Sequence, residues 1–306
     1  MVQIIATAES LEQAEQLLTA GVDQLYIGND DFGLRLPKSF SNDDIETITQ
    51  MTHEQDKKII VAVNAMMHNE HIEAVTSYLQ FLEQIGVDAI TVGDPGVIHI
   101  MRKEHIALPY IYDAHTLVTS ARQINFWVKR GATGAVLARE LTWTELQQIS
   151  AQVDVPLEIL TYGATCIHQS KRPLVENYFN FVGEDTDTSK ERGLFLSEPK
   201  RKNTNYSIYE DKNGTHIFAS DDVNLIDSLD QLYDAGIRHW KLDGIFTKGE
   251  RFVEIAKLFF QGKKALLNGT WSNDLKLSLN EQLINLHPVE RTLSKGFYTK
   301  EPSEVQ

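Results

Sequence analysis

The chain has 306 residues, a length that suits either two ordinary domains or one α/β barrel. Its 29 Lys and Arg residues against 43 Asp and Glu residues give a net charge of −14. This charge argues against tight nonspecific binding to nucleic acid or anionic membranes, although it is compatible with a local basic patch. Hydrophobic residues make up 42% and charged residues 24%, the balance of a globular protein with a full core.

Cysteine content and apolar runs exclude further classes. The single cysteine, Cys166, excludes an internal disulfide, a cysteine-ligated zinc site and an iron–sulfur cluster held by four cysteines of this chain alone. The first residues lack a basic segment followed by an apolar one, so we expect no secretory signal. No apolar run approaches the roughly 18 residues that span a bilayer. We therefore expect a soluble, cytoplasmic protein with no membrane partner.

Short runs rich in Val, Ile and Leu recur along the chain, each followed by apolar residues at the three- and four-residue steps of a helix. The runs predict strands at Gln3–Thr7, Gln24–Ile27, Ile59–Asn64, Ala89–Val92, Tyr110–Asp113, Ala135–Ala138, Leu157–Thr161 and Ile237–Leu242. Glycines that supply a left-handed residue close the helices before several strands, at Gly21, Gly86, Gly131 and Gly236. This repetition favours parallel β/α units.

These strands match the eight units that a closed (β/α)8 TIM-like barrel requires. A doubly wound sheet normally carries a glycine-rich phosphate loop after its first strand, and the segment Thr7–Ser10 is not such a loop. The sequence therefore predicts one barrel domain over residues 1–300. We expect the tail, residues 301–306, to be frayed.

A long insertion interrupts the pattern between the seventh and eighth strands, at about residues 163–236. Within it, the alternating runs Asn205–Tyr209 and Thr215–Phe218 flank an Asn-Gly pair, which predicts a β-hairpin. The segment Gly183–Arg192 is polar, and we expect it to be mobile. A helix is predicted near Glu250–Phe260, after the eighth strand.

Polar residues gather at the predicted carboxyl ends of the strands, where barrels of this type carry their chemistry. They include Asn29, Arg35, Asn64, Asp94, Asp113, His115, Arg139, Glu140, the segment Tyr162–His168, Lys241 and Asp243. Some have a structural explanation, because Asp94 before Pro95 is typical of a helix N-cap and Asn64 is another cap candidate.

Three arginines near this rim, Arg35, Arg139 and Arg172, are predicted to bind an anion, because guanidinium groups match carboxylate and phosphate geometry. The alternative is that they form rim salt bridges with Glu140 and Asp94. Under the first hypothesis each arginine contributes to affinity, whereas under the second its loss has little effect.

Cys166 lies two residues before His168, which raises the question of a thiolate nucleophile. Proximity in sequence is not triad geometry, and no charge-paired base is evident, so we expect a packed and unreactive thiol. A metal pair of His115 and His168 with Asp113 or Glu158 lacks a known ligand spacing, so we predict no permanent metal.

The chain resembles the peptidase U32 family, also called the collagenase-like protease family, along nearly its whole length. The central match runs from Glu158 through Gly163-Ala164 and Cys166 to Ser170-x-Arg172, in the order of the family signature. Further matching blocks follow in order: Tyr26-Ile27-Gly28 with Phe32 and Arg35, Asp94-Pro95-Gly96, Arg139-Glu140-Leu141-Thr142, Lys241-Leu242-Asp243-Gly244 and Gly296-Phe297-Tyr298.

The chain also departs from the family pattern. Pro173 stands where a second cysteine is usual, and Asp243-Gly244-Ile245 stands where the family has Glu-Gly-Arg. Members with an iron–sulfur cluster use four cysteines, so that property does not carry over and we expect no cluster. Short members of this kind resemble the first of two neighbouring bacterial paralogues, of which the longer has an additional C-terminal domain.

The resemblance implies a role in RNA chemistry. Some members are named as collagenases, and others hydroxylate quinones or RNA, forming 5-hydroxyuridine at the tRNA wobble position with prephenate as a required metabolite. We therefore expect a subunit of wobble-uridine hydroxylation that acts on tRNA with a longer paralogue and uses prephenate. The expected ligand-binding residues are Arg35, Arg139, Arg172, Asn64 and His115, and the acid/base or positioning residues are Glu140, Glu158 and Asp243.

Two alternatives stay open, and with them whether the chain is itself an enzyme. One is a collagenase-like peptidase, a hydrolase whose catalytic set would be Cys166, His168 and Glu158. The sequence has no metalloprotease helix motif and no Gly-x-Ser-x-Gly elbow to support it. The other is a non-catalytic scaffold for a catalytic paralogue, which the missing second cysteine and arginine favour over the peptidase.

Overall fold

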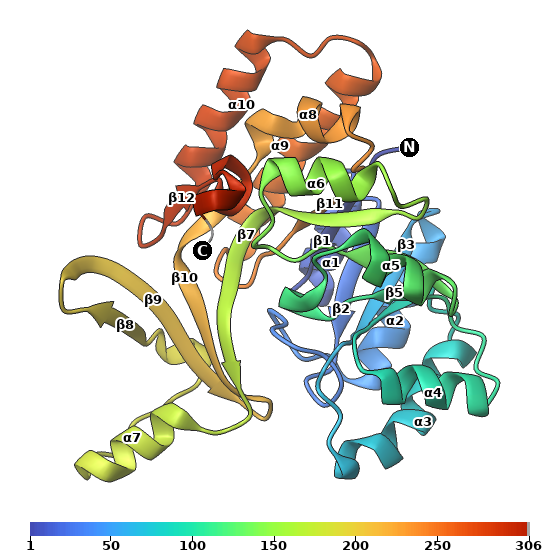
Figure 1. The fold of residues 1–306 in the computed structure, drawn as a ribbon, viewed down its shortest axis with the longest axis vertical. Helices are drawn as coiled ribbons and strands as arrows, with labels where there is room; N and C mark the ends of the chain where they lie inside the picture. The colour runs from blue at the N-terminus through green and yellow to red at the C-terminus, as the bar shows by residue number, and fades with distance from the viewer. Residues whose placement is uncertain (305–306) are drawn as a thin grey trace.

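The structure, a computed structural model, describes residues 1–304; the side chains of residues 69–71, 201–203 and 302 are outside that description. Within residues 1–304, eight parallel strands form a closed barrel, which confirms the predicted fold class (Figure 1). The barrel strands are β1 (Gln3–Thr7), β2 (Gln24–Gly28), β3 (Lys58–Val63), β4 (Ala89–Val92), β5 (Tyr110–Tyr112), β6 (Ala132–Val136), β7 (Leu157–Ser170) and β11 (His239–Leu242). β11 pairs in parallel with both β1 and β7, and this closes the ring.

Helices pack around the barrel because each presents an apolar face to the strands. In α1, Ala14, Leu17 and Leu18 are buried, and Ser10 caps the helix by accepting from the Gln13 amide. The helices that follow or surround the strands are α1 (Leu11–Thr19), α2 (Asn42–Glu54), α3 (Asn69–Gln84), α4 (Pro95–Lys103), α5 (Ala121–Val128), α6 (Trp143–Ser150), α8 (Leu229–Asp234), α9 (Gly249–Leu267) and α10 (Asn273–Leu286). Over residues 1–304, no helix has both the length and the apolar character that a bilayer crossing demands.

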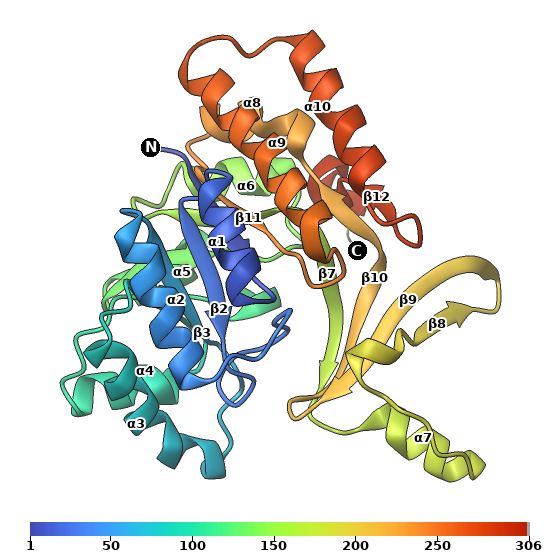
Figure 2. The same cartoon turned by 180° about the vertical axis from the view of Figure 1, so that it is seen from behind.

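An arm projects from one side of the barrel, and we use this name for residues 163–224. It contains the distal half of β7, α7 (Leu174–Val182), β8 (Phe195–Glu198), β9 (Arg201–Asp211) and β10 (Gly214–Asn224). β10 pairs antiparallel with β7 on one side and with β9 on the other, and β9 pairs with β8. Both views show α7 standing away from the barrel (Figures 1 and 2).

The main difference from the sequence prediction is the length of β7. The predicted strand ends at Thr161, whereas β7 continues to Ser170 because its second half pairs with β10. The segment after Tyr162, which we had placed beyond the strand, is therefore extended β-structure. β6 begins at Ala132, three residues before the predicted start, and its pairing with β5 begins there.

The C-terminal part of the chain contains more regular secondary structure than the sequence predicts. α9 extends past Phe260 to Leu267, and α10 packs along it. The short strand β12 (Thr292–Ser294) then joins β10. Residues Pro302–Glu304 form a single 3-10 turn, and the last two residues of the tail that we expected to be frayed lie outside the described residues.

Candidate functional site

A pocket of about 570 Å³ opens at the carboxyl ends of the barrel strands. This volume is typical of sites for small molecules. The structure brings nine of the predicted site residues to its lining: Arg35, Asn64, His115, Arg139, Glu140, Glu158, Cys166, His168 and Asp243. The polar part of the wall also includes Tyr26, Asp94, Asp113, Thr116, Gln169 and Lys241.

Arg172 is not among the residues that line the pocket. It follows the end of β7 and is exposed, and its backbone carbonyl accepts a hydrogen bond from Thr215 Oγ1 at 2.8 Å. Since β7 continues to Ser170 in the arm, the chain has left the barrel mouth before it reaches this residue. The predicted group of three arginines is therefore a pair, Arg35 and Arg139.

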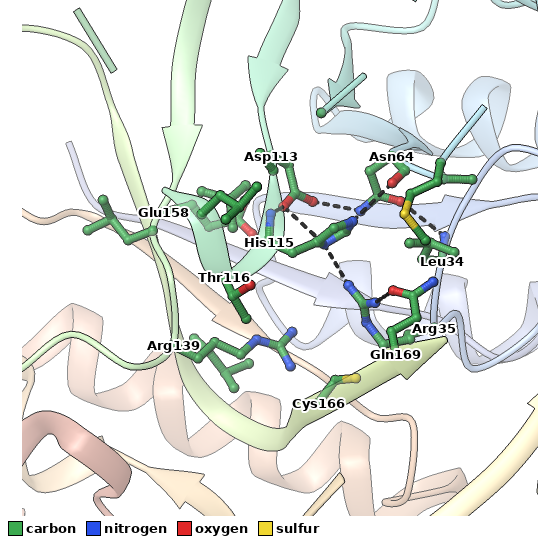
Figure 3. Close-up of a pocket in the computed structure, with 18 of the residues that line it drawn as sticks. Leu34, Arg35, Asn64, Asp113, His115, Thr116, Arg139, Glu158, Cys166 and Gln169 are labelled. Atoms are coloured by element: carbon green, nitrogen blue, oxygen red, sulfur yellow. Dashed lines mark hydrogen bonds and ion pairs between the residues drawn. The ribbon is translucent and has the colours of Figure 1, made fainter. Parts of the chain in front are cut away.

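Arg35 is held by two neutral groups rather than by a carboxylate. Its Nη1 donates to Gln169 Oε1 at 2.7 Å and its Nη2 to His115 Nδ1 at 2.6 Å (Figure 3). The Nε2 of His115 donates in turn to the backbone carbonyl of Asn64 at 3.0 Å. Because guanidinium only donates and a carbonyl only accepts, the imidazole is neutral with its proton on Nε2.

The surroundings of His115 also favour the neutral form of its imidazole. Burial and the charge of Arg35 lower the pKa of His115 to about 4. Its Nδ1 lies 3.5 Å from Asp113 Oδ1, but the neutral ring makes no ion pair there. In the part of the chain that the structure describes, no carboxylate oxygen lies within 4.0 Å of the Arg35 guanidinium. The positive charge of Arg35 is thus available to a ligand.

Asn64 connects the loop that carries Arg35 to the barrel through its side-chain hydrogen bonds. It does not cap a helix, which was the structural role that the sequence had suggested for it. Its Oδ1 accepts from the Leu34 amide at 3.0 Å, and its Nδ2 donates to Asp113 Oδ2 at 2.6 Å and to the Tyr26 hydroxyl at 3.2 Å. Asp94 does cap α4, accepting from the Gly96 amide at 2.7 Å, as predicted.

The floor of the pocket holds a buried ion pair. Lys241 Nζ lies 3.5 Å from Glu158 Oε1 and 3.0 Å from the centre of the Tyr26 ring. Burial raises the pKa of Glu158 and lowers the pKa of Lys241, since each charge has lost its water. The second oxygen of Glu158, Oε2, is buried and has no hydrogen-bond partner among the described residues.

Arg139 has a backbone partner and a distant carboxylate. Its Nη1 donates to the Ala164 carbonyl at 2.6 Å, and its Nη2 lies 3.6 Å from Asp243 Oδ2. Asp243 also accepts from the Ile245 amide at 3.0 Å, so its orientation is fixed by its own loop. The alternative of rim salt bridges to Glu140 and Asp94 is not what the structure shows for Arg139, whose carboxylate neighbour is Asp243, while Glu140 is exposed at the rim.

A buried imidazole of β10, His216, lies close to the segment of Cys166, and its Nδ1 has no hydrogen-bond partner among the described residues. Cys166 pairs with Phe218 in the β7–β10 ladder, two residues from His216. His216 is fully buried, and its Nε2 lies 2.9 Å from Asp211 Oδ1 at the start of the hairpin turn. Sequence reasoning found the Asn-Gly hairpin, but it did not align that hairpin with the segment of Cys166.

The groups around Cys166 shift the pKa of its thiol in both directions. Burial raises the pKa of the Cys166 thiol, but His216, Arg35 and Arg139 together bring it below its ordinary value. Burial lowers the pKa of His216, but its contacts with Asp211 and Cys166 bring it above its ordinary value. The thiol itself donates to the His168 carbonyl, and its expected lack of reactivity stays a prediction.

The peptidase set expected from the sequence is not assembled. The side chain of Glu158 pairs with Lys241, and Cys166 Sγ donates at 3.3 Å to the backbone carbonyl of His168, not to its ring. Across the described side chains, no group of three or more His, Cys, Asp or Glu is arranged to hold a metal ion. A cluster bound by four cysteines does not fit a chain whose single cysteine is Cys166.

A closed β/α barrel with a charged pocket at its mouth is the general architecture of many enzymes. The sequence of residues 9–306 matches the model of Peptidase family U32, and the chain belongs to this family. A solved structure of a U32 peptidase has the same fold, with a TM-score of 0.52 and 14% identity over 82% of this chain and 94% of that chain.

Two curated relatives carry names from RNA modification. The chain is 35% identical over 303 residues to "tRNA hydroxylation protein P2" of Bacillus subtilis, which covers 98% of both proteins. It is 23% identical over 339 residues to "tRNA hydroxylation protein P" of Escherichia coli, which covers 96% of this chain and 74% of that protein.

Proposed function

We propose that this chain is a component of tRNA hydroxylation at the wobble uridine, a reaction whose product is 5-hydroxyuridine. The observation that carries this proposal is the 35% identity to a tRNA hydroxylation protein over 98% of both chains. The pocket supports it, because an open site of about 570 Å³ with charged groups in its wall has the size for one nucleotide base or one small metabolite.

The pocket residues divide into binding and positioning groups in this proposal. Arg35 and Arg139 bind an anion, either prephenate or a phosphate of the tRNA. Asn64 and His115 hold Arg35 in place through the loop and the imidazole described above. Glu158 and Asp243 are the acid/base or positioning groups beside this anion, and the exposed Glu140 contributes at the rim.

A longer paralogue is the proposed protein partner, with tRNA as substrate. The arm supports a partner on this side, because α7 has no buried residue along residues 174–182 and exposes large apolar side chains. Tyr178 is 60% exposed and Phe181 is 89% exposed. Exposed aromatic groups on one projecting helix are typical of contact surfaces.

The test is mass spectrometry of tRNA nucleosides from a strain that lacks the gene for this chain. We expect 5-hydroxyuridine to be lost and to return when the wild-type gene is restored. Two variant genes are then compared in the deletion strain, Arg35→Ala inside the pocket and Arg172→Ala outside it. We expect Arg172→Ala to restore 5-hydroxyuridine and Arg35→Ala not to restore it. Unchanged 5-hydroxyuridine in the deletion strain contradicts the proposal.

The same strain distinguishes the two alternatives. If the chain is a non-catalytic scaffold, genes with substitutions in the pocket should restore 5-hydroxyuridine as well as the wild-type gene does. A thiol peptidase would need Cys166 as its nucleophile, and the buried His216, whose Nε2 lies 2.9 Å from Asp211 Oδ1, is an imidazole on the neighbouring strand. It predicts gelatin cleavage by the purified protein that Cys166→Ser abolishes.

A further inference from the structure

The loop that carries Arg35 is held by the arm as well as by the barrel. This Arg35 loop spans residues 29–41, between β2 and α2, and within that range it has no helix or strand. Arg35 has a left-handed backbone there, with φ of 56°, and strain of this kind persists only where the surroundings fix it. In both views the turn between β9 and β10 lies beside the loop (Figures 1 and 2). Contacts from the arm are therefore candidates for the groups that fix Arg35.

Lys190 joins the arm to the two residues that follow Arg35. Its Nζ donates to the backbone carbonyl of Leu36 at 2.9 Å and to that of Pro37 at 2.6 Å. Hydrogen bonds of an ammonium group are charge-assisted and stronger than those between neutral groups. The backbone on both sides of Lys190 is itself hydrogen-bonded to β9. Lys190 therefore fixes the backbone next to Arg35 relative to the arm.

Asn213 makes a second contact, with the residues that precede Arg35. It is 5% exposed and lies in the turn between β9 and β10, where its backbone amide donates to Asp211 Oδ1 at 2.7 Å. Its Nδ2 donates to the carbonyl of Asp30 at 2.8 Å and to that of Gly33 at 3.4 Å. The backbone is thus bound to the arm on both sides of Arg35.

The side chain of Arg35 contacts the same arm. Its Nη1 donates to Gln169 Oε1 at 2.7 Å, and Gln169 belongs to the part of β7 that pairs with β10 (Figure 3). A movement of the Arg35 loop away from the arm would break this hydrogen bond and the one to His115. The placement of the guanidinium group therefore depends on the contacts that hold the loop.

We propose that Lys190 and Asn213 are positioning residues for anion binding, which anchor the Arg35 loop to the arm and so hold the guanidinium group in place before an anion binds. This inference rests on the proposed function, in which Arg35 binds an anion. Neither anchor is among the described residues that line the pocket, so both act through Arg35. A site that is already ordered binds more tightly, because affinity scales with the fraction of molecules in the binding conformation.

The first measurement needs no ligand and follows the imidazole of His115 by NMR as pH is varied. In wild type, burial and the charge of Arg35 lower the pKa of His115 to about 4. In Lys190→Met and in Asn213→Ala we expect this pKa to rise, because the guanidinium group moves away. Arg35→Ala gives the rise that follows complete loss of the charge. An unchanged pKa of His115 in both anchor variants would overturn the proposal.

The second measurement is calorimetric titration with prephenate. We expect Lys190→Met to bind it about tenfold more weakly than wild type, which corresponds to a loop in the binding conformation about one tenth of the time. Lys212→Met is the matched control, since it removes the same charge from the arm. Its ion pair with Asp31 of the same loop is exposed, so its loss should leave the affinity unchanged.

A double-mutant cycle separates positioning from a general effect of charge or stability. If Lys190 acts through Arg35, adding Lys190→Met to Arg35→Ala should weaken prephenate binding no further. A long-range effect of the lysine charge would persist without Arg35. Equal losses from Lys190→Met in both backgrounds, or an equal loss in Lys212→Met, would contradict the proposal.

The two measurements separate this inference from the function on which it rests. If wild type and Lys190→Met bind prephenate equally, the anion site stands and the anchor is refuted. If wild type binds neither prephenate nor a tRNA anticodon stem–loop but the pKa of His115 rises in Lys190→Met, the anchor holds Arg35 and the anion site of the proposed function is refuted.

Discussion

Arg35 and His115 are both non-glycine residues with left-handed backbones, with φ of 56° and 55°. This conformation costs roughly 1–2 kcal/mol for a residue with a Cβ. The two side chains form a hydrogen bond with each other, between Arg35 Nη2 and His115 Nδ1 at 2.6 Å. The two strained backbones therefore position the side chains for a single contact. Strain of this kind is common where a side chain must be fixed for a ligand. In this pocket it fixes a guanidinium group that has no carboxylate partner.

The arginine pair should therefore act on a ligand and not on stability. We expect Arg35→Ala and Arg139→Ala each to remove a charge-assisted contact worth roughly 1.5–3 kcal/mol, a loss of about ten- to hundred-fold in affinity. Calorimetric titration with prephenate and with a tRNA anticodon stem–loop measures this effect. Arg172→Ala is the control outside the pocket, and its affinity should equal that of wild type. Equal binding by all three variants would refute an anion site.

The neutral His115 makes stability depend on pH. Its folded pKa of about 4 lies below the ordinary value of 6.5, so between these values the unfolded chain binds more protons than the folded one. The free energy of unfolding should fall as pH decreases from 6.5 to 4, by up to about 3 kcal/mol from this residue. Urea denaturation at several pH values measures the slope, and His115→Asn should flatten it, since Asn tolerates the left-handed backbone.

His239 provides the matched control for that slope. Burial also lowers its pKa to about 4, but it lies at the amino end of β11, where its backbone pairs with Gln3 and Glu158, and it does not line the pocket. His239→Gln should flatten the pH dependence of stability by a similar amount and leave anion binding unchanged. If His115→Asn likewise leaves anion binding unchanged, His115 does not position Arg35.

β7 carries more of the site than any other strand, and its pairing is where sequence and structure differ most. The barrel strands are predictable because runs such as Ile59–Val63 are continuously apolar, as strands buried on both faces must be. Residues Thr165–Ser170 are mostly polar and resemble a loop, yet the antiparallel partner β10 satisfies their backbone. The pocket location follows from the barrel alone, and so nine of its lining residues were predictable.

The position of His216 near the segment of Cys166 was not predictable for a related reason. The two residues are 50 positions apart, and only the register of β7 against β10, in which Cys166 pairs with Phe218 and His216 with Gln169, places them on neighbouring strands. Single-sequence patterns report which segment is a strand, but they carry no information on the alignment of two strands that a long crossover separates. The position of Arg172 was missed because the same extension of β7 carries it into the arm.

A glycine marks the point where β7 leaves the barrel wall. Gly163 has φ of 120°, and a Cβ there would collide with the backbone carbonyl of Asp243. We expect Gly163→Ala to lower the free energy of unfolding by about 3–5 kcal/mol, because it combines a disfavoured backbone with a backbone clash. Chemical denaturation measures the loss.

Gly183 at the end of α7 is the control for the backbone contribution. It also has positive φ, 77°, but nothing lies within 4 Å of a Cβ built on it. Gly183→Ala should cost only about 1–2 kcal/mol, the cost of the left-handed backbone alone. Equal losses at both glycines would show that β11 and β7 are not in close contact at the mouth.

The cysteine content of this sequence supports one further prediction, on metal content. Purified protein should contain no stoichiometric iron, and its visible spectrum should lack charge-transfer bands, because one thiolate cannot supply the ligands of a cluster. The iron determination is to be repeated on the complex with any co-purified paralogue. Stoichiometric iron in that complex that disappears with Cys166→Ser would mean that a cluster is shared between subunits.

Barrel and arm share β7, and this limits how related proteins can vary in length. Residues 158–162 of β7 pair with β11 in the barrel, and residues 162–170 pair with β10 in the arm. Gain or loss of one residue between Gly163 and Ser170 would turn every following side chain to the opposite face, and would take Gln169 away from Arg35. Along this strand, insertions and deletions that preserve the pocket are therefore expected beyond Ser170, where the chain has left the β7–β10 ladder.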